Sequence, residues 1–182
     1  MIINFIFNFK KIEINNIYYL KIYIITKTQM GEILFYGNNN KYGEFSNFYP
    51  CEITIDDISY PTTEHYFQAM KYIDNDEYFE KIRSASTPGK AAIMGRNRKI
   101  PIRKDWEKVK NKIMRKAIRA KFSQNKKLRK ALVKTEGFKL IEHTKNDSYW
   151  GDGGDGTGKN MLGKILVKIR KEIMDGKLDL LV

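Results

Sequence analysis

The stretch DWEKVKNKIMRKAIRAKF, residues 105–122, carries the strongest structural signal in the chain. Its first residue, Asp105, is of a type that commonly caps the start of a helix. The residues of its apolar stripe recur at i, i+3, i+7 and i+11, at Trp106, Val109, Ile113 and Ala117. This spacing places them on one face of a helix. The stretch therefore predicts a long amphipathic helix, with Asp105 as its cap.

Shorter predicted elements flank this helix on both sides. Apolar alternation and turn residues predict strands at 32–36, 53–60 and 138–143, the second of them a hairpin that turns at Asp56 and Asp57. Apolar residues at helical spacing, with capping residues before them, predict helices at 63–73, 75–85, 87–94, 125–134 and 160–173. In the first of these helices, Phe67, Met70 and Ile73 form the expected buried stripe. The fold class is α+β: a helix-rich single domain with a small, mainly antiparallel sheet.

Length and composition are those of an ordinary globular domain. The chain has 182 residues, 42% of them hydrophobic and 30% charged. With only Cys51, His65 and His143 available, a disulfide framework is excluded and a Cys/His metal site is poorly supplied. No apolar run is long enough to cross a membrane. We therefore expect a cytoplasmic protein that binds no metal, no cofactor and no membrane, and whose histidines serve packing or hydrogen bonding.

The first 30 residues differ from the rest of the chain, because they are rich in Ile, Asn and Tyr and alternate only weakly. A β-prone extension, a degenerate targeting segment and a translation start upstream of the natural Met30 all fit this pattern. No small-residue cleavage site follows the apolar stretch, so a signal peptide is disfavoured. We expect an N-terminal extension at 1–30, one domain at 31–176 and a short tail at 177–182.

The positive charge is concentrated in one region. The net charge is +13, but residues 81–134 hold 20 Lys and Arg against Asp105 and Glu107, a local charge of +18. The remainder of the chain carries −5. Such a concentration favours an anionic partner, either a phosphorylated small molecule or a nucleic acid. Solvated faces of lysine-rich helices are the alternative explanation.

A glycine-rich loop, YWGDGGDGTGKN at 149–160, separates the last predicted strand from the last helix. It fits the G-x-x-x-x-G-K pattern of a P-loop, but Asn160 stands where a Ser or Thr should hold Mg²⁺. Asp152 and Asp155 are three residues apart and do not match the alternate ligand positions of an EF-hand. A Gly-Gly-x-Gly calcium repeat occurs once only, although that motif works in stacked copies. A long turn before the helix remains the simple alternative.

Two polar segments are candidates for chemistry. Glu64, Gln68 and Lys71 recur on one face of the predicted helix at 63–73, and Glu64 lies in its first turn, where free N–H groups favour a charged carboxylate. A charged carboxylate beside a cleft can stabilise the cation that forms as a glycosidic bond breaks. A favourable first-turn acid with no catalytic role is the alternative. In GEFSNFYP, residues 43–50, aromatic rings alternate with Ser46 and Asn47, a composition suited to binding a flat heterocycle but also common in cores.

Four blocks together resemble the NADAR, or YbiA-like, N-glycosidase family: GEFSNFYP, PTTEHYFQAMK, MGRNRKIPIRKDWEKVKNKIMRKAIRAKFSQN and KLIEHTKNDSYWGDGGDGTGKNMLG. The resemblance extends over residues 35–173. It implies hydrolysis of N-glycosidic bonds without a metal or cofactor. Some members release ribose 5-phosphate from phosphoribosylamino-pyrimidine intermediates of riboflavin synthesis, and others remove ADP-ribose from modified guanine.

The resemblance also implies site residues. Glu64 and Trp106 match positions regarded as functional in this family, and Asp147 and Asp152 match acidic positions around its WGD block. We expect Glu64 to stabilise the ribosyl cation, one of the two aspartates to position water, and Trp106 and Phe48 to bound the base or sugar. Phosphate contacts are expected from Lys71, Arg96 and Arg98. The full expected binding set is Ser46, Asn47, Phe48, Gln68, Lys71, Arg96, Arg98, Trp150, Gly151 and Asn160.

The leading hypothesis from the sequence is an N-glycosidase acting on a phosphoribosylamino-pyrimidine. The alternatives are a glycohydrolase that removes ADP-ribose from nucleic acid, which the basic region favours, and a non-catalytic binder of ADP-ribose or nucleic acid. Loss of Glu64 or Asp152 would favour the binder, and both residues are present.

Overall fold

The computed structural model describes residues 31–37 and 40–178. Its helices are α2 (Thr63–Ala69), α3 (Asp76–Arg83), α4 (Pro88–Met94), α5 (Trp106–Gln124), α6 (Lys126–Val133) and α7 (Met161–Met174). Short 3₁₀ turns, η1 (Gly43–Phe45) and η2 (Met70–Tyr72), add to these. The strands are β1 (Glu32–Phe35), β2 (Ile53–Ile55), β3 (Ile58–Tyr60) and β4 (Lys139–Glu142). The helix-rich α+β class predicted from the sequence is therefore confirmed.

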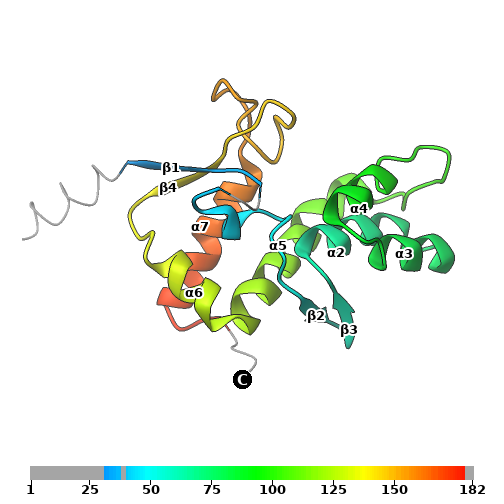
Figure 1. Cartoon of the computed structure of the whole chain (residues 1–182), viewed down its shortest axis with the longest axis horizontal. Coiled ribbons are helices and arrows are strands. Elements are labelled where there is room, and N and C mark those ends of the chain that lie inside the picture. The colour runs from blue at the N-terminus through cyan, green and yellow to red at the C-terminus, as the bar shows by residue number, and fades with distance from the viewer. Residues whose placement is uncertain (1–30, 38–39, 179–182) are drawn as a thin grey trace, which may run out of the picture.

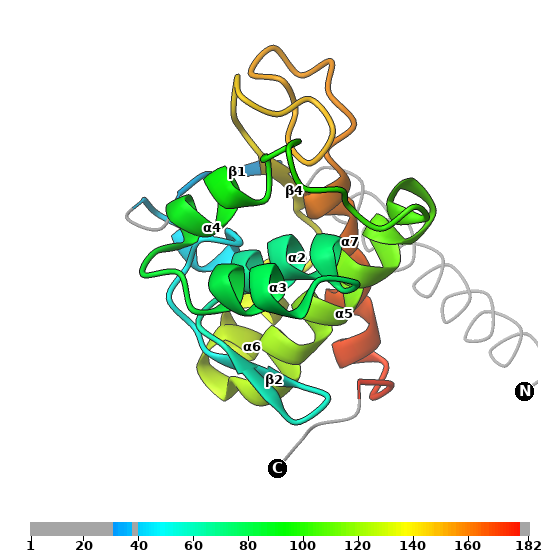
Figure 2. The same cartoon turned by 90° about the vertical axis from the view of Figure 1, so that its right-hand side faces the viewer.

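Helix α5 is the central element, and it contacts α2, β2, α6 and α7. In Figure 1, α2, α3 and α4 lie at one end of α5, whereas α6, α7 and the β1–β4 pair lie toward its other end. Figure 2 shows α4 and α3 in front of α2 when the molecule is turned. Ile113, Ala117 and Ile118 on the inner face of α5 are fully or almost fully buried in the hydrophobic core. The apolar stripe of residues 105–122 thus joins the two halves of the fold.

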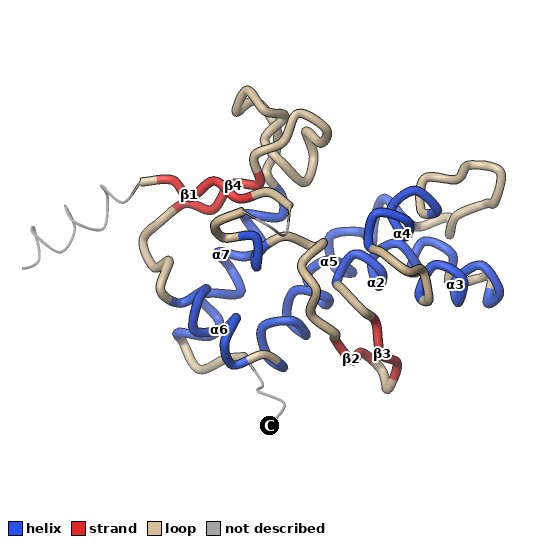
Figure 3. The backbone as a smooth tube through the Cα atoms, viewed as in Figure 1, coloured by secondary structure: helices blue, strands red, loops and turns tan. Residues whose placement is uncertain are grey.

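The strands form two separate two-stranded sheets instead of one mainly antiparallel sheet (Figure 3). β2 and β3 make the predicted antiparallel hairpin, with Asp56 and Asp57 at positive φ in its turn. β1 and β4 pair in parallel, with Glu32 opposite Lys139. The expectation failed for this pair because most of the domain lies between the two strands as a helical crossover, the kind of connection that parallel strands require.

Two local expectations also need correction. Asp105 precedes α5 but makes no side-chain capping bond; its carboxylate instead pairs with Arg103, with a Nε–Oδ1 distance of 2.5 Å. The predicted helix at 63–73 ends as α2 at Ala69 and continues as the tighter turn η2. This change of periodicity rotates the final residue of the expected stripe, Ile73, outward, where it is 40% exposed.

Residues 1–30 lie outside the described residues, so the proposed extension stays a prediction. Within the described part of the chain, no helix combines the length and apolar character needed to cross a bilayer.

Deleting residues 1–29 should leave a folded, active protein, because the hydrophobic core of the described chain begins at Ile33. Deleting residues 1–36 should instead destabilise it, since Ile33 and Phe35 of β1 are buried core residues. Thermal unfolding and activity of both truncations, beside the full chain, check this. An insoluble or inactive protein after the shorter deletion would mean that the extension belongs to the core.

Candidate active site

A cleft of about 740 Å³ opens between the two halves of the fold. Its walls come from α2, α4, the segment after η1, the end of β4 and the loop that follows β4. The volume lies in the range that holds a nucleotide-sized ligand. The predicted site residues that line it are Ser46, Asn47, Phe48, Glu64, Gln68, Lys71, Arg96, Asp147 and Trp150.

Glu64 is held in the first turn of α2 with only 6% of its surface exposed. The backbone carbonyl of Asn47 accepts a hydrogen bond from the Glu64 N–H (3.2 Å), which ties the segment after η1 to the start of α2. Gln68, one turn later, donates from Nε2 to Glu64 Oε1 at 2.7 Å. Burial raises the pKa of Glu64, opposed by Gln68 and by the positive charges of Lys71 and Arg96. Position in the first helical turn therefore does not by itself keep this carboxyl charged, contrary to the expectation from sequence.

Lys71 reaches the cleft from η2 and is almost fully buried. Its Nζ donates to the carbonyl of Gly95 at 3.1 Å and lies 5.6 Å from the ring centre of Phe67. Burial lowers the pKa of Lys71 to about 8, with Glu64 acting in the opposite direction. A phosphate in the cleft would favour the protonated lysine.

Gly95 allows α4 to approach α2 closely at this point. A Cβ built on Gly95 would lie 1.8 Å from Gln68 Oε1. The same Oε1 is buried and makes no hydrogen bond within the described residues. A side chain at position 95 would therefore displace Gln68, and with it the hydrogen bond to Glu64.

Glu142, which the sequence interpretation missed, is the last residue of β4 and lines the cleft. Burial, together with the neighbouring charges of Asp147 and Glu64, raises its pKa to about 8. A signal did exist in the sequence, because Glu142 shares a strand face with the buried Leu140. Glutamate is rarely buried without a partner, so a glutamate on the inward face of a strand indicates a structural or functional role.

Asp147 lies on the same side of the cleft as Glu142, in the loop after β4. Its Oδ1 accepts hydrogen bonds from the N–H groups of Tyr149 (2.8 Å) and Trp150 (2.7 Å). Within the described residues, Oδ2 makes no hydrogen bond to the protein. One oxygen of Asp147 thus fixes the loop, and the other is available to water or substrate.

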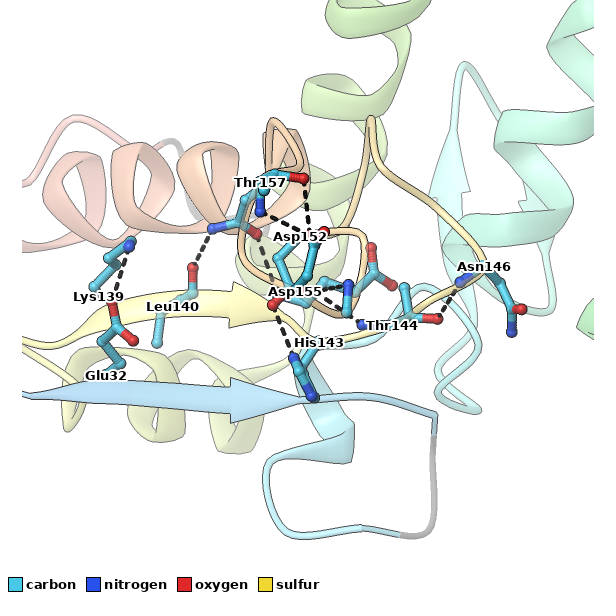
Figure 4. A network of polar contacts seen from close by, with 12 residues as sticks. Glu32, Lys139, Leu140, His143, Thr144, Asn146, Asp152, Asp155 and Thr157 are labelled. Carbon is cyan, nitrogen blue, oxygen red and sulfur yellow. Dashed lines mark hydrogen bonds and ion pairs between the residues drawn. The ribbon is translucent and has the colours of Figure 1, made fainter.

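Asp152 does not line this cleft. Figure 4 shows its carboxylate inside the glycine-rich loop, with Oδ2 2.8 Å from His143 Nδ1 and Oδ1 accepting from the N–H groups of Thr144 (3.1 Å) and Gly154 (2.9 Å). Burial acts to raise the pKa of Asp152, but these hydrogen bonds hold it below its ordinary value. Asp152 borders a separate groove of about 970 Å³ along β4 and α7. Its carboxylate organises the loop instead of facing the cleft.

Gly151 and Asn160 likewise hold the loop together. A Cβ on Gly151 would lie 2.8 Å from the carbonyl oxygens of Asp147 and Glu142. The Asn160 side chain bridges β4 to α7, since it accepts from Glu142 N at 3.1 Å and donates to Leu140 O at 2.8 Å. Both residues therefore support the wall of the cleft from behind.

Two further predicted residues lie outside the cleft. Trp106 is buried against Phe67, with 5.0 Å between ring centres, so it packs behind a residue that lines the cleft. Arg98 is exposed, and its guanidinium lies 3.4 Å from the Gly95 carbonyl. The structure thus brings Lys71 and Arg96 to the cleft but not Arg98.

A buried lysine supports the opposite wall. Lys121 of α5 is 1% exposed and donates from Nζ to the carbonyl of Ser46 at 2.8 Å. Burial lowers its pKa to about 7. Since Ser46 lines the cleft, this bond connects the central helix to the site.

The histidines make hydrogen bonds, as expected. His65 is buried, with Nδ1 2.8 Å from Thr62 Oγ1 and Nε2 3.0 Å from the Ala85 carbonyl. In the described part of the chain, no group of three or more His, Cys, Asp and Glu side chains is arranged to hold a metal.

Comparison with known proteins identifies the family of the chain. The NADAR domain model matches residues 34–174, most of the chain. The chain belongs to the NADAR family. The N-glycosidase YbiA of Shigella boydii is 53% identical over 141 residues, which cover 78% of this chain and 88% of that protein. A riboflavin biosynthesis protein of Vibrio vulnificus is 39% identical over 143 residues, but the match covers only 39% of that longer protein.

A solved structure supports the same NADAR relationship. The NMR structure of the Escherichia coli protein YbiA matches with a TM-score of 0.76 and 50% identity, over 84% of this chain and 89% of that one. The helix-rich α+β fold and the N-glycosidase relationship predicted from the sequence are therefore confirmed.

Proposed function

We propose that this NADAR protein is an N-glycosidase that hydrolyses the bond between ribose 5-phosphate and the amine of a phosphoribosylamino-pyrimidine. The observation that carries the proposal is the composition of the cleft, where the carboxyl groups of Glu64, Glu142 and Asp147 meet the cations of Lys71 and Arg96. Carboxyl groups suit cleavage of a glycosidic bond, and cations suit a phosphate. The N-glycosidase relatives support the reaction, and the Vibrio riboflavin protein supports the class of substrate.

In this mechanism, Glu64 stabilises the positive charge that develops on the ribosyl ring as the C–N bond breaks. Gln68 fixes the orientation of its carboxyl group through the 2.7 Å bond. Lys71 and Arg96 bind the 5-phosphate and also favour the ionised form of Glu64.

The proton and the water come from the other side of the cleft. Glu142, whose pKa is about 8, retains its proton at neutral pH and can deliver it to the departing nitrogen. Asp147 has one oxygen fixed by backbone N–H groups, and the second can orient the attacking water. We assign the water to Asp147 instead of Asp152 because only Asp147 lines the cleft.

The direct test is to incubate the protein separately with a 5-phosphoribosylamino-pyrimidine and with an oligonucleotide that carries ADP-ribosylated guanine. Mass analysis then identifies the sugar released from each. We expect ribose 5-phosphate from the first substrate. Release of ADP-ribose alone would favour the nucleic-acid alternative, and release of neither would favour the non-catalytic binder.

The basic region is the observation that favours a nucleic-acid substrate. In the structure, part of its charge is paired with acidic residues of other elements. Lys116 of α5 pairs with Asp56, and Arg115 and Arg119 both pair with Glu172 of α7. Paired charges contribute less to a phosphate-binding surface, so the small substrate is preferred.

Charge reversal of exposed lysines on α5 should barely affect hydrolysis of the small substrate. Lys108 and Lys112 are exposed and lie outside the cleft, so Lys108→Glu with Lys112→Glu should leave kcat/KM within about twofold, and KM should change only modestly with salt. If α5 instead binds a polynucleotide, its affinity falls with salt at a log–log slope of about −0.7 to −0.9 per phosphate contact. DNA and RNA binding across a salt series measures this slope.

Lys171→Glu with Lys177→Glu is the matched control, because both lysines are exposed, Lys171 in the last turn of α7 and Lys177 just after the helix ends. Tight, steeply salt-dependent binding of DNA or RNA that is lost only in the α5 variant would overturn the preference for the small substrate. ADP-ribosylated nucleic acid would then be the preferred substrate.

A further inference from the structure

Two large apolar side chains stand exposed on the walls of the cleft. Tyr36, directly after β1, is 45% exposed, and Ile93, near the end of α4, is 65% exposed. Both line the cleft, and neither belongs to the hydrophobic core or to the partly buried layer around it. A ligand that covers exposed apolar surface inside a cleft removes that surface from water, and this stabilises the complex.

Three polar side chains of the cleft lie deeper than these two residues. Glu64, Gln68 and Lys71 are each at least nine-tenths buried. A ligand whose sugar phosphate contacts these groups would therefore place its remaining part toward Tyr36 and Ile93. Arg96 follows Ile93 by three residues, so a phosphate at Arg96 and an apolar contact at Ile93 are compatible with one extended ligand.

A polar group at the same place matches the edge of a heterocycle. Asn146 lines the cleft, and its Nδ2 lies 3.5 Å from the Tyr36 hydroxyl. An aromatic face offers stacking to a flat ring, and a neighbouring carboxamide can donate to and accept from ring nitrogens and carbonyls. Neither the aromatic face nor the carboxamide carries a positive charge that would bind a phosphate group.

We propose that Tyr36 and Ile93 form the subsite for the leaving group, a flat nitrogen heterocycle, and that Asn146 reads its edge. This inference rests on the proposed N-glycosidase function and extends it, because it assigns the part of the cleft that the phosphate and carboxyl chemistry leaves unused. The leaving group is held by apolar and stacking contacts near the solvent, whereas the sugar is held by charge in the interior.

The two products of the proposed reaction, ribose 5-phosphate and an aminopyrimidine for which 5,6-diaminouracil is the probe, test this subsite without turnover. Dissociation constants of 5,6-diaminouracil and of ribose 5-phosphate are measured separately by calorimetry for the full chain, Tyr36→Ala, Ile93→Ala and the control Ile73→Ala. Ile73 is also an exposed hydrophobic residue but does not line the cleft. We expect about tenfold weaker binding of 5,6-diaminouracil in the first two variants, with ribose 5-phosphate unchanged within about twofold.

The outcomes separate this inference from the function on which it rests. If the full chain binds ribose 5-phosphate and the two variants bind the heterocycle as well as it does, the subsite is wrong and the N-glycosidase proposal stands. An equal weakening of both ligands means that the residues support the cleft as a whole, which also overturns the subsite. If the full chain binds neither ligand and does not cleave the substrate, the proposed function fails and the subsite falls with it.

Discussion

Replacing Glu64 with glutamine should lower kcat by about 10²–10³-fold while the protein stays folded, because the change removes a charge that the transition state uses. Glutamine has nearly the same shape, and its carbonyl can still accept the hydrogen bond from Gln68. Burial raises the pKa of Glu64, and burying a neutral amide costs less desolvation free energy than burying a charged carboxylate, so we expect no large loss of stability. Single-turnover kinetics and thermal unfolding of the variant measure both effects.

Glu77→Gln is the matched control, since Glu77 also lies in the first turn of a helix, α3, but is exposed. It should retain normal kcat. Near-normal kcat in Glu64→Gln would remove Glu64 from the mechanism. A large loss of thermal stability in that variant would mean that Glu64 is needed for structure, and the kinetic loss would then carry no information on its charge.

Most helices were predictable because their signals are local. Thr87 accepts the capping bond from Lys90 N–H, Pro88 begins α4 and Gly95 ends it, as the residue types indicated. Asn125 likewise caps α6 by accepting from Leu128 N–H. Such signals act within one or two helical turns, so one sequence is enough to read them.

The parallel pairing of β1 and β4 was not predictable in the same way. Glu32 and Lys139 are neighbours only because the helices between them return the chain in the same direction. No residue of either strand encodes that direction locally. The antiparallel hairpin at 53–60 was predictable because its turn residues lie between its strands.

The candidate site was only partly predictable for a related reason. Residue types identified the acidic positions of the loop after β4, but not which carboxylate faces the cleft. Asp147 and Asp152 differ in this respect because His143 and two backbone N–H groups bind Asp152 inside the loop. Glu142 was missed because its role depends on the end of β4 lining the same cleft as α2, an arrangement that only the tertiary fold produces.

Glu142 should produce the alkaline limb of the pH–rate profile. Its pKa is raised to about 8, so the protonated acid is present below that pH and is lost as pH rises through it. The kcat of the wild type should therefore fall above about pH 8. Glu142→Gln cannot transfer a proton, and we expect its kcat to be about 10²-fold lower and to show no alkaline limb.

Lys71 must be separated from Glu142 in this experiment, because its pKa is also about 8. The other charged groups around Glu142 are Glu64, Asp147 and Asp152. Lys71→Arg keeps a cation at every pH, so an alkaline limb of kcat that persists in this variant does not come from Lys71. Loss of phosphate binding by neutral Lys71 should instead appear as a rise in KM.

Glu136→Gln is the control for Glu142→Gln, since Glu136 is an exposed glutamate shortly before β4. It should retain both normal kcat and the alkaline limb. If Glu142→Gln keeps the limb while Lys71→Arg loses it, the titrating group is Lys71 and Glu142 is not the acid. If Glu142→Gln loses the limb while its kcat below pH 7 stays normal, Glu142 affects the site only through its charge above pH 8, and the departing nitrogen takes its proton from another group.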